Sequence, residues 1–559
     1  MHYWFIGVGA AVLLLIGAIA SAWPPVLWSL LLIGPLLLLG VHDMLQREHS
    51  VRRNYPLVGR GRWVMEGLRP YVRQYLLESD TDGAPINRMF RAVVYQRAKL
   101  ALDTVPFGTR VDTYRPGYEW IGHSISAIPV TEVEEDALRV RIGGPDCTQP
   151  YSASVLNISA MSFGSLSANA LRALNRGAAR GGFCHNTGEG GLSPYHLEGG
   201  DLVWQIGTGY FGCRDADGRF HPEAFREKAG LAAVKLIELK LSQGAKPGHG
   251  GILPAAKNTP EIARIRGVSP WTQVDSPAAH SAFDSPLGLM HFIATLRELS
   301  GGKPVGFKLA IGRRSEFIGI CKAMLETGIT PDFITVDGGE GGTGAAPLEY
   351  ANSIGMPLRE ALAFVDDCLI GYGLRARVRV IAAGKILSGF HMVKNLALGA
   401  DLCNSARGMM LALGCVQSLT CNTNRCPTGV ATQDPRLVRG LVVADKAERV
   451  ANYHARTVHA VAEIIASAGL RHTDELDRTH VFRRVSPAEI RRYDQLFPVM
   501  PPGALLGDEL PESYALDVEE AAVDSFLPRR HLAEREQRES ASRARTRSED
   551  VKETAVEPR

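Results

Sequence analysis

The sequence predicts an α/β protein, a (β/α)8 barrel of the TIM type that follows an N-terminal pair of apolar helices. Between residues 152 and 470, short runs rich in β-branched residues alternate with helical patterns in roughly eight units. The expected strands are continuous apolar runs, as in parallel sheets whose two faces are both covered. An open doubly wound sheet is the competing fold, but no Gly-x-Gly-x-x-Gly turn follows the first expected strand. We therefore expect a closed barrel.

The expected strands cover residues 155–160, 183–186, 202–205, 234–241, 305–309, 333–336, 378–382 and 400–404. The expected helices include residues 168–179, 260–266, 287–299, 316–326, 358–372 and 390–397. In such barrels the reacting groups lie at the C-terminal ends of the strands. The search for a site therefore concentrates on the residues that follow each expected strand.

Residues 4–41 are almost free of charge, and two prolines, Pro24 and Pro25, divide them into two apolar runs. Helices of about 17 to 20 residues reach roughly 25 to 30 Å, close to the thickness of a bilayer's hydrocarbon. We expect a transmembrane hairpin over residues 1–45. A cleaved signal peptide is the alternative, but the first residues lack Lys and Arg and a second apolar run follows at once.

Six arginines follow the second apolar run, with no comparable charge in the turn between the two runs. They are Arg47, Arg52, Arg53, Arg60, Arg62 and Arg69. The positive-inside rule then predicts an inner (cytoplasmic) membrane protein whose body lies in the cytoplasm. We expect a collar over residues 46–150, the barrel over 151–470, a C-terminal extension over 471–527 and a charged, disordered tail over 528–559, for which a tethering helix is the alternative. The net charge of +3 gives no support for a nucleic-acid partner.

Three cysteines, Cys415, Cys421 and Cys426, stand at a C-x5-C-x4-C spacing on one glycine-bounded loop. Loops of this kind hold iron–sulfur clusters, and three thiolates fit a three-iron cluster better than a four-iron one. Three buried thiols, or a zinc site completed by Cys403 or a histidine, are the alternatives. The other cysteines lie far apart along the chain, which is typical of a reducing compartment rather than of a disulfide framework.

Polar and glycine-rich motifs follow the expected strands in order, at residues 159–165, 186–191, 246–251, 337–344, 383–385 and 405–408. This ordered set, with a cluster loop that ends in Cys-Pro-x-Gly, resembles the FMN-binding synthase domain of the glutamate synthase large subunit. The resemblance covers about residues 150–470. With its N-terminal hairpin, the chain is similar to the stand-alone, membrane-anchored branch of that family.

The resemblance implies FMN, a [3Fe-4S] cluster on the three cysteines, and reductive amination of 2-oxoglutarate to glutamate through 2-iminoglutarate. The late strands are where barrels commonly bind phosphate, and the first strand end would line the flavin ring. Lys308 would place a positive charge beside the reduced ring. The positions expected to bind FMN are Ala160, Met161, Ser162, Lys308, Asp337, Gly341, Gly342, Gly384, Lys385, Gly389, Ser405 and Gly408.

The same resemblance makes Lys246 and Arg266 the expected anchors of the substrate, with Glu189 and Lys240 as neighbours in the catalytic set. Arginine grips a carboxylate with two parallel hydrogen bonds, and Lys246 would bind the second carboxylate or polarise the oxo group. Glu189 would give or take a proton during imine formation. The ordinary alternative for each of these residues is a solvated charge at the rim of the barrel.

Two departures from the family pattern bear on the substrate. His249 stands where the family usually has an acid, and Ile252 stands where it usually has an amide. Loss of a hydrogen-bonding group usually changes which substrate is tolerated, because unpaired polar groups are costly. A related 2-oxo acid, or an amine as the second substrate, is therefore an alternative to 2-oxoglutarate and ammonia.

The chain has no N-terminal cysteine nucleophile for glutamine hydrolysis, so we expect ammonia to come from solution or from a partner. No dinucleotide fingerprint is evident, so electrons should enter through the cluster from a ferredoxin, a reductase subunit or a membrane carrier. Two competing functions are a non-catalytic membrane electron-transfer module and a flavin dehydrogenase of another amino acid. The expected dicarboxylate clamp favours the aminating enzyme.

Overall fold

A computed structural model describes residues 1–134 and 136–534 of the chain. The chain divides into two compact units, Met1–Arg88 and Met89–Arg559. Residues 535–559, most of the tail predicted to be disordered, lie outside the described part. The domain bounds stated above stay predictions.

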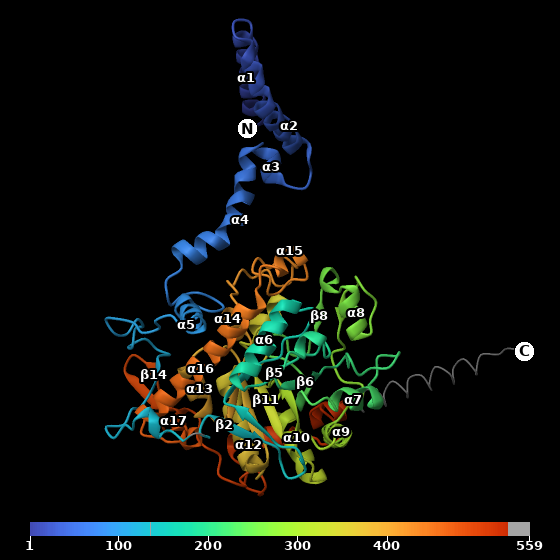
Figure 1. Cartoon of the computed structure of the whole chain (residues 1–559), viewed down its shortest axis with the longest axis vertical. Coiled ribbons are helices and arrows are strands. Elements are labelled where there is room, and N and C mark those ends of the chain that lie inside the picture. The colour runs from blue at the N-terminus through green and yellow to red at the C-terminus, as the bar shows by residue number, and fades with distance from the viewer. Residues whose placement is uncertain (135, 535–559) are drawn as a thin grey trace, which may run out of the picture. The chain divides into compact units, whose positions relative to one another are not determined.

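The first unit begins with a helical hairpin of α1 (His2–Ala20), η1 (Pro24–Ser29) and α2 (Leu30–Leu45) (Figure 1). Both helical stretches are long and apolar enough to cross a membrane. Gly40 allows the close approach of the two helices, because a Cβ at this position would overlap the ring of Phe5. The short elements α3 (Ser50–Asn54), η2 (Val58–Arg60), α4 (Gly61–Val72) and the π-helical turn η3 (Arg73–Leu77) follow.

The second unit contains a closed barrel of eight parallel strands, which confirms the predicted (β/α)8 fold. Around the barrel the order is β10, β11, β12, β13, β4, β5, β6 and β7. In chain order the strands are β4 (Leu156–Ile158), β5 (His185–Asn186), β6 (Leu202–Ile206), β7 (Val234–Lys240), β10 (Val305–Leu309), β11 (Phe333–Asp337), β12 (Arg379–Ala383) and β13 (Leu402–Ser405).

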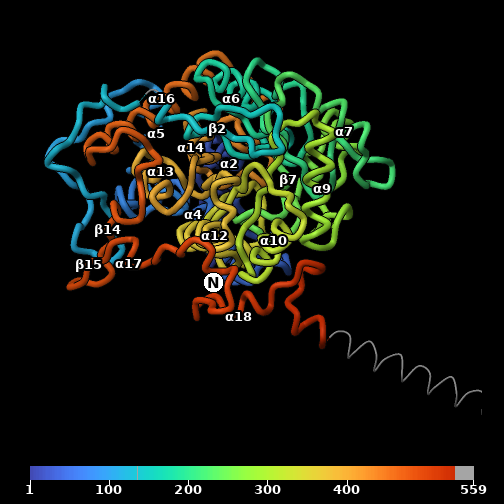
Figure 2. The backbone as a smooth tube through the Cα atoms, turned by 90° about the horizontal axis from the view of Figure 1, so that it is seen from below, coloured from blue at the N-terminus to red at the C-terminus, as the bar shows by residue number. Residues whose placement is uncertain are grey.

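Helices lie around the strands, as the view from below shows (Figure 2). They include α6 (Ala168–Gly181), α7 (Pro222–Ala229), α9 (Pro286–Leu299), α10 (Arg314–Thr327), α12 (Leu358–Gly371) and α13 (Gly389–Leu396). Local sequence sets their ends: Ser167 caps α6 by accepting from the Ala170 N–H, and Gly182 ends it with a φ of 64°. The 25-residue helix α16 (Val443–Ser467) packs against α6 and α13.

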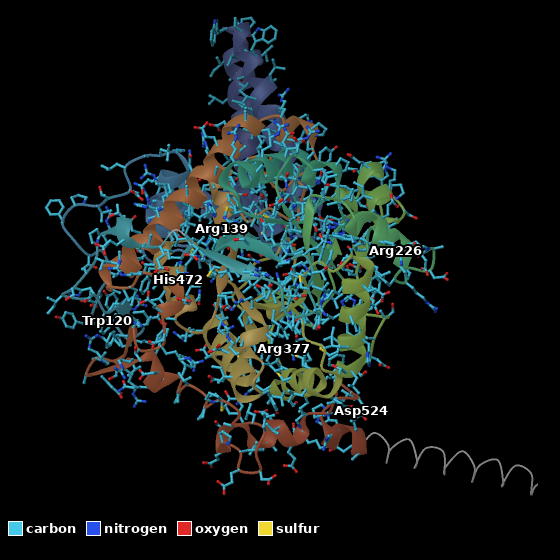
Figure 3. The ribbon with its side chains drawn as sticks, turned by 60° about the horizontal axis from the view of Figure 1, so that its bottom comes forward. Trp120, Arg139, Arg226, Arg377, His472 and Asp524 are labelled. Atoms are coloured by element: carbon cyan, nitrogen blue, oxygen red, sulfur yellow. The ribbon has the colours of Figure 1, made fainter. Side chains whose placement is uncertain are left out.

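A β-hairpin of β2 (Arg139–Ile142) and β3 (Tyr151–Ser154) closes the N-terminal end of the barrel. Ile142 and Ala153 of this hairpin belong to one buried cluster with residues from the barrel strands, among them Phe333 and Leu402. Arg139, labelled in Figure 3, donates to the carbonyl of Gly182 at 3.1 Å and so ties the hairpin to the turn after α6. Because the hairpin fills this end of the barrel, the opposite end, where the strands finish, is the one open to a site.

The remaining elements surround the barrel. A three-stranded sheet joins β1 (Glu119–Ile121) from the predicted collar to β14 (Val481–Ser486) and β15 (Glu489–Arg492) from the predicted extension. In this sheet Trp120 stacks on Phe482, with ring centroids 5.6 Å apart. Glu119 accepts from Arg359 at 2.8 Å and from Lys394 at 3.0 Å. Burial alone would raise the pKa of Glu119, but Lys394 and Arg483 lower it to about 2. The part of the collar that carries β1, together with the extension, therefore packs against the barrel helices.

Candidate active site

A largely buried ion pair joins two of the residues predicted to be catalytic. Lys240, the last residue of β7, places its Nζ 2.8 Å from Oε1 of Glu189, which lies on the loop after β5. Gly207 and Gly251 leave room for the carboxylate, because a Cβ at either position would contact the Glu189 side chain. Burial by itself would raise the pKa of Glu189, but nearby cations outweigh it and lower the pKa. Glu189 is therefore a carboxylate at neutral pH.

Arg266 is the last residue of the short helix α8 (Pro260–Arg266), which Thr259 caps and Gly267 ends. Its Nη2 donates to the carbonyl of Phe163 at 3.0 Å, and its guanidinium lies 5.2 Å from the ring centroid of Phe211. Among the described residues, its Nε has no hydrogen-bond partner. Burial lowers the pKa of Arg266 to about 10, and Glu189 opposes the shift. A buried cation with an unused donor faces this part of the site.

Lys246 is 2% exposed, and its Nζ donates to the carbonyl of Ala345 at 2.9 Å. Burial lowers its pKa to about 8, although Glu189 acts in the opposite direction. Lys240, Lys246 and Arg266 all act electrostatically on Glu189. The structure therefore brings all four predicted catalytic residues together, and the Glu189 carboxylate faces three cations, while the exposed Asp275 also acts on Lys246. This local excess of positive charge suits an anionic ligand.

Lys308 and Asp337, both predicted to bind FMN, form a second ion pair with 3.1 Å between Nζ and Oδ2. Asp337 also accepts from the backbone N–H of Gly244 at 3.0 Å. In the barrel, Lys308 lies directly opposite Lys240 on the neighbouring strand. Burial would lower the pKa of Lys308, but Asp337 and other carboxylates raise it. Lys308 is therefore charged, and its pair with Asp337 is electrically balanced.

A polar network that was not predicted surrounds Glu238, which precedes Lys240 on strand β7. Glu238, two residues before Lys240, accepts hydrogen bonds from Asn186 at 2.8 Å, Gln205 at 2.6 Å and Thr335 at 2.7 Å. Side chains two residues apart on a strand point to the same face, so the spacing of Glu238 and Lys240 could have revealed an inward-facing pair. The network fixes the strands that carry the site.

The segment after β4 supplies Ala160, Met161 and Ser162, the residues expected beside a flavin ring. Ser162 Oγ accepts from Arg266 Nη2 at 3.4 Å, which connects this segment to the cation cluster. Gly188 lies against the same backbone with a φ of 65°, and a Cβ there would be 2.7 Å from the Ser162 nitrogen. The segment is therefore held closely between the loop after β5 and α8.

The loops after β11, β12 and β13 bring together the residues predicted to bind phosphate. Lys385, with a φ of 47°, lies near Arg407, and burial lowers the pKa of both cations. Arg407 Nη2 donates to the carbonyl of Glu340 at 2.8 Å, and a Cβ on Gly342 would be 2.8 Å from Arg407 Nε. Arg407 lies within the motif at residues 405–408 but was not among the residues predicted to bind FMN. The donor set fits a phosphate: two cations and a backbone without side chains at Gly341, Gly342 and Gly384.

At two of the predicted phosphate-binding positions, Gly389 and Gly408, close packing leaves no space for a side chain. A Cβ on Gly389, at the start of α13, would be 3.0 Å from the backbone of Ala460 on α16. A Cβ on Gly408 would contact the hydroxyl groups of Tyr453 and Ser405. Ser405 Oγ itself donates to the carbonyl of Ile386 at 2.6 Å. Close helix packing accounts for both glycines.

The three cysteines of the predicted cluster loop influence one another electrostatically. Burial raises the pKa of Cys415 to about 11 and also raises that of Cys421. For Cys426, donors from the Thr428 hydroxyl and from neighbouring backbone N–H groups overcome burial and lower the pKa. Hydrogen bonds of this kind favour a thiolate, the form that binds metal.

Among the described residues, no group of three His, Cys, Asp or Glu side chains could hold a single metal ion. Cys403, the fourth ligand of the zinc alternative, is fully buried in β13. The described geometry therefore gives no support to a zinc site. An iron–sulfur cluster carries its own sulfide ions between iron and thiolate, so its ligands need not converge on one point.

Lys257 connects the cysteine loop with the segment after β4 and was not predicted. Its Nζ donates to the carbonyl of Ser165 at 2.7 Å and to that of Cys421 at 3.1 Å. Gln433 makes a parallel connection, since its Nε2 donates to the carbonyl of Leu166 at 2.8 Å. Lys257 thus bridges the cysteine loop and the segment after β4.

A histidine and a tyrosine also support the site and were missed. His280 Nε2 lies 2.9 Å from the carbonyl of Lys240, and His280 Nδ1 lies 3.0 Å from the hydroxyl of Tyr210. Burial lowers the pKa of His280 to about 4, so the imidazole is neutral. Only the structure reveals these residues, because they come from loops without a recognisable motif.

The two positions that depart from the family pattern lie on the segment between β7 and α8. His249 packs edge-on against Tyr350, with ring centroids 5.2 Å apart. Ile252 begins the short strand β8 (Ile252–Leu253), which pairs with β9 (Val274–Asp275).

Comparison with known proteins identifies the family. Residues 133–471 match the model of a conserved region in glutamate synthase. The chain is 38% identical over 494 residues to the glutamate synthase large subunit-like protein YerD of Bacillus subtilis, covering 82% of this chain and 94% of that protein. It is 36% identical over 439 residues to an archaeal-type glutamate synthase (NADPH) of Thermotoga maritima, covering 76% of this chain and 82% of that one.

Solved structures resemble the chain only distantly. A mutant flavocytochrome b2 with pyruvate bound has a TM-score of 0.41 at 11% identity and covers 75% of this chain and 84% of its own. A lactate oxidase of Pediococcus acidilactici has a TM-score of 0.42 at 13% identity, with 75% and 93% covered. Nothing about substrate follows from similarity at this level. The family model and the curated relatives confirm the resemblance noted in the sequence: the chain belongs to the glutamate synthase family of oxidoreductases.

Proposed function

We propose that the chain catalyses the flavin-dependent reductive amination of 2-oxoglutarate, or of a related 2-oxo acid, with ammonia from solution or from a partner. The observation that carries this proposal is the largely buried group in which Lys240, Lys246 and Arg266 all act electrostatically on the carboxylate of Glu189. Buried charges need compensation, and a dianionic oxo acid would supply it. An electron-transfer module would have no use for such a site.

Each member of this group has a role in the proposed reaction. Arg266, with an unused donor, binds one substrate carboxylate, and Lys246 binds the other or polarises the oxo group. Glu189, ionised beside Lys240, takes protons from the attacking ammonia and returns them as water leaves. Overall, one oxo acid, one ammonia, two electrons and two protons yield one amino acid and one water.

FMN would supply the hydride chemistry in this reaction. Lys385 and Arg407 would hold its phosphate beside the backbone at Gly341, Gly342 and Gly384. The segment from Ala160 to Ser162 and the Lys308 ammonium would border its ring. Thiolates of Cys415, Cys421 and Cys426 would hold the [3Fe-4S] cluster, and the contacts of Lys257 support a short route from the cysteine loop to the segment after β4.

We also propose that α1 and α2 anchor the protein in the inner membrane, with its body in the cytoplasm. Their length and apolar composition support this placement, as do the arginines that follow them. A ferredoxin, a reductase subunit or a membrane carrier would deliver electrons. Relatives with NADPH in their names make a reductase partner that uses this nucleotide a natural candidate.

A single-turnover experiment tests the reaction. The purified protein, solubilised in detergent and reduced without oxygen, is mixed with one 2-oxo acid at a time, with and without ammonia. We expect 2-oxoglutarate or a close relative to reoxidise the flavin rapidly, and only when ammonia is present. If no 2-oxo acid reoxidises the flavin but an amino acid other than glutamate reduces the oxidised flavin, the result supports a flavin dehydrogenase of that amino acid. If neither reaction occurs, the result supports a non-catalytic electron-transfer module.

A further inference from the structure

Helix α4 and the turn η3, in the first unit, present a continuous apolar surface to their surroundings. At about 100° per residue, the apolar residues of α4 fall within an arc of about 120°. These are Val64, Met65, Leu68, Tyr71 and Val72, with exposed fractions of 56%, 66%, 47%, 61% and 38%. Tyr75, Leu76 and Leu77 of η3 extend this surface and are at least 57% exposed. We call these eight residues the apolar arc.

The other sides of α4 are polar or already packed. Arg62, Glu66 and Arg69 lie together on the side away from the arc. Trp63 packs within the first unit: its ring lies 5.0 Å from that of His49, and the guanidinium of Arg52 lies 4.2 Å above it. The helix is therefore amphipathic and fixed by Trp63, while its apolar arc contacts little else in the first unit.

The segment is strongly basic. Residues 46–77 contain seven arginines against two glutamates. A basic amphipathic helix of low overall hydrophobicity is typical of segments that lie in the interface of a membrane, and anionic headgroups attract such arginines. A soluble protein partner would not need this excess of positive charge beside the apolar arc.

The position of α4 next to the hairpin also favours a membrane as the partner of the apolar arc. Arg60, directly before α4, donates hydrogen bonds to Asp43 of α2, from Nε to Oδ2 at 2.8 Å and from Nη2 to Oδ1 at 2.7 Å. The N–H of Leu57 also donates to Asp43 at 3.2 Å. These bonds hold the start of α4 at the end of the second apolar helix, where the proposed span leaves the bilayer.

We propose that α4 and η3 bind the cytoplasmic surface of the bilayer, with the apolar arc among the acyl chains and the arginines against anionic headgroups. This surface rests on the proposed membrane anchor and would be continuous with it. Besides the two spans, the membrane would then bind a third segment that fixes the direction in which the chain leaves the membrane.

The test uses the full-length protein reconstituted in bilayers of phosphatidylcholine and phosphatidylglycerol with brominated acyl chains, which quench a nearby fluorophore. A thiol-reactive fluorophore is attached to L68C in the apolar arc or to E66C, two residues away on the opposite side of the helix. L14C, on the exposed surface of α1, reports on the anchor itself. Wild-type protein labelled in parallel gives the background from the native cysteines.

We expect brominated lipid to quench the probes at positions 68 and 14 by about half or more, and the probe at position 66 by about a tenth or less. Quenching at 14 without quenching at 68 would overturn the surface proposal while leaving the anchor intact, and would mean that protein covers the arc. Loss of quenching at both positions would overturn the anchor. Equal quenching at 68 in purely zwitterionic bilayers would overturn the role given to anionic headgroups.

Discussion

Glu189 Oε1 and Lys240 Nζ lie 2.8 Å apart across the end of β6, where Gly207 leaves the space that the carboxylate fills. The partners come from the loop after β5 and from the end of β7, so barrel closure itself assembles the pair. Lys246 and Arg266 then add two further cations to the same carboxylate. This arrangement is the basis of the predictions that follow.

Replacing Glu189 by Gln should lower kcat by about a hundredfold or more, because it removes the group that moves protons during imine formation. The substrate KM should not rise, because the change removes a negative charge from a site that binds an anion. Steady-state rates with a reduced dye as electron donor measure both constants. A normal kcat with an unchanged or lowered KM would show that Glu189 only balances charge.

The pKa of Lys246, lowered to about 8 by burial, predicts a pH dependence of substrate binding. Below that pH the ammonium is charged and binds a carboxylate; above it the group loses its proton and the attraction. kcat/KM should therefore fall about tenfold per pH unit on the alkaline side of about 8. In K246R the alkaline limb should move to higher pH, because arginine keeps its charge. An unchanged limb would assign the titration to another group.

Replacing Arg266 by Ala should lower kcat/KM by about thirtyfold to a thousandfold, the equivalent of about 2 to 4 kcal/mol, with FMN retained. Lysine at this position should restore only part, because it lacks the planar fork. Arg264, on the same helix and exposed, provides the control: R264A should keep nearly normal activity. Near-normal turnover of every 2-oxo acid by R266A would show that Arg266 does not bind the substrate.

Replacing Cys421 by Ser should remove the bound iron and the visible absorption of the cluster, because serine is a poor ligand for a soft metal site. C147S is the matched control, since Cys147 lies outside the cysteine loop and should leave iron content unchanged. Iron analysis and absorption spectra of both variants check the prediction. Iron retained in full by C421S would rule out Cys421 as a ligand.

The barrel was predictable because covered parallel strands leave a strong signal of continuous apolar runs. All eight strands occur where expected, with ends that differ by a few residues, for example residues 156–158 instead of 155–160. The hairpin of β2 and β3 was missed because it lies in a mixed polar segment, where its pairing with the barrel bottom depends on tertiary contacts. Helix α16 was missed although it is the longest in the second unit's described part.

Glu189, Lys240 and Lys246 were predictable because each stands at a strand end or in a motif that follows one, whereas Arg266 ends helix α8 and was expected only from the family resemblance. Their neighbours were not: His280 supports Lys240 through a backbone carbonyl, and Lys257 reaches the cysteine loop through two more. Contacts to backbone carbonyls impose no sequence pattern. The same holds for Arg407, whose role depends on loops that meet only when the barrel closes.

The central claim is that the group around Glu189 binds and aminates a dianionic 2-oxo acid. The most direct test incubates the reduced full-length protein with 2-oxoglutarate and ¹⁵N-labelled ammonia and follows labelled amino acid by mass spectrometry. The account predicts one labelled glutamate for each two electrons consumed by the wild-type protein, and at least about thirtyfold slower formation by R266A. Electron consumption with no labelled amino acid from 2-oxoglutarate or any related 2-oxo acid would contradict it.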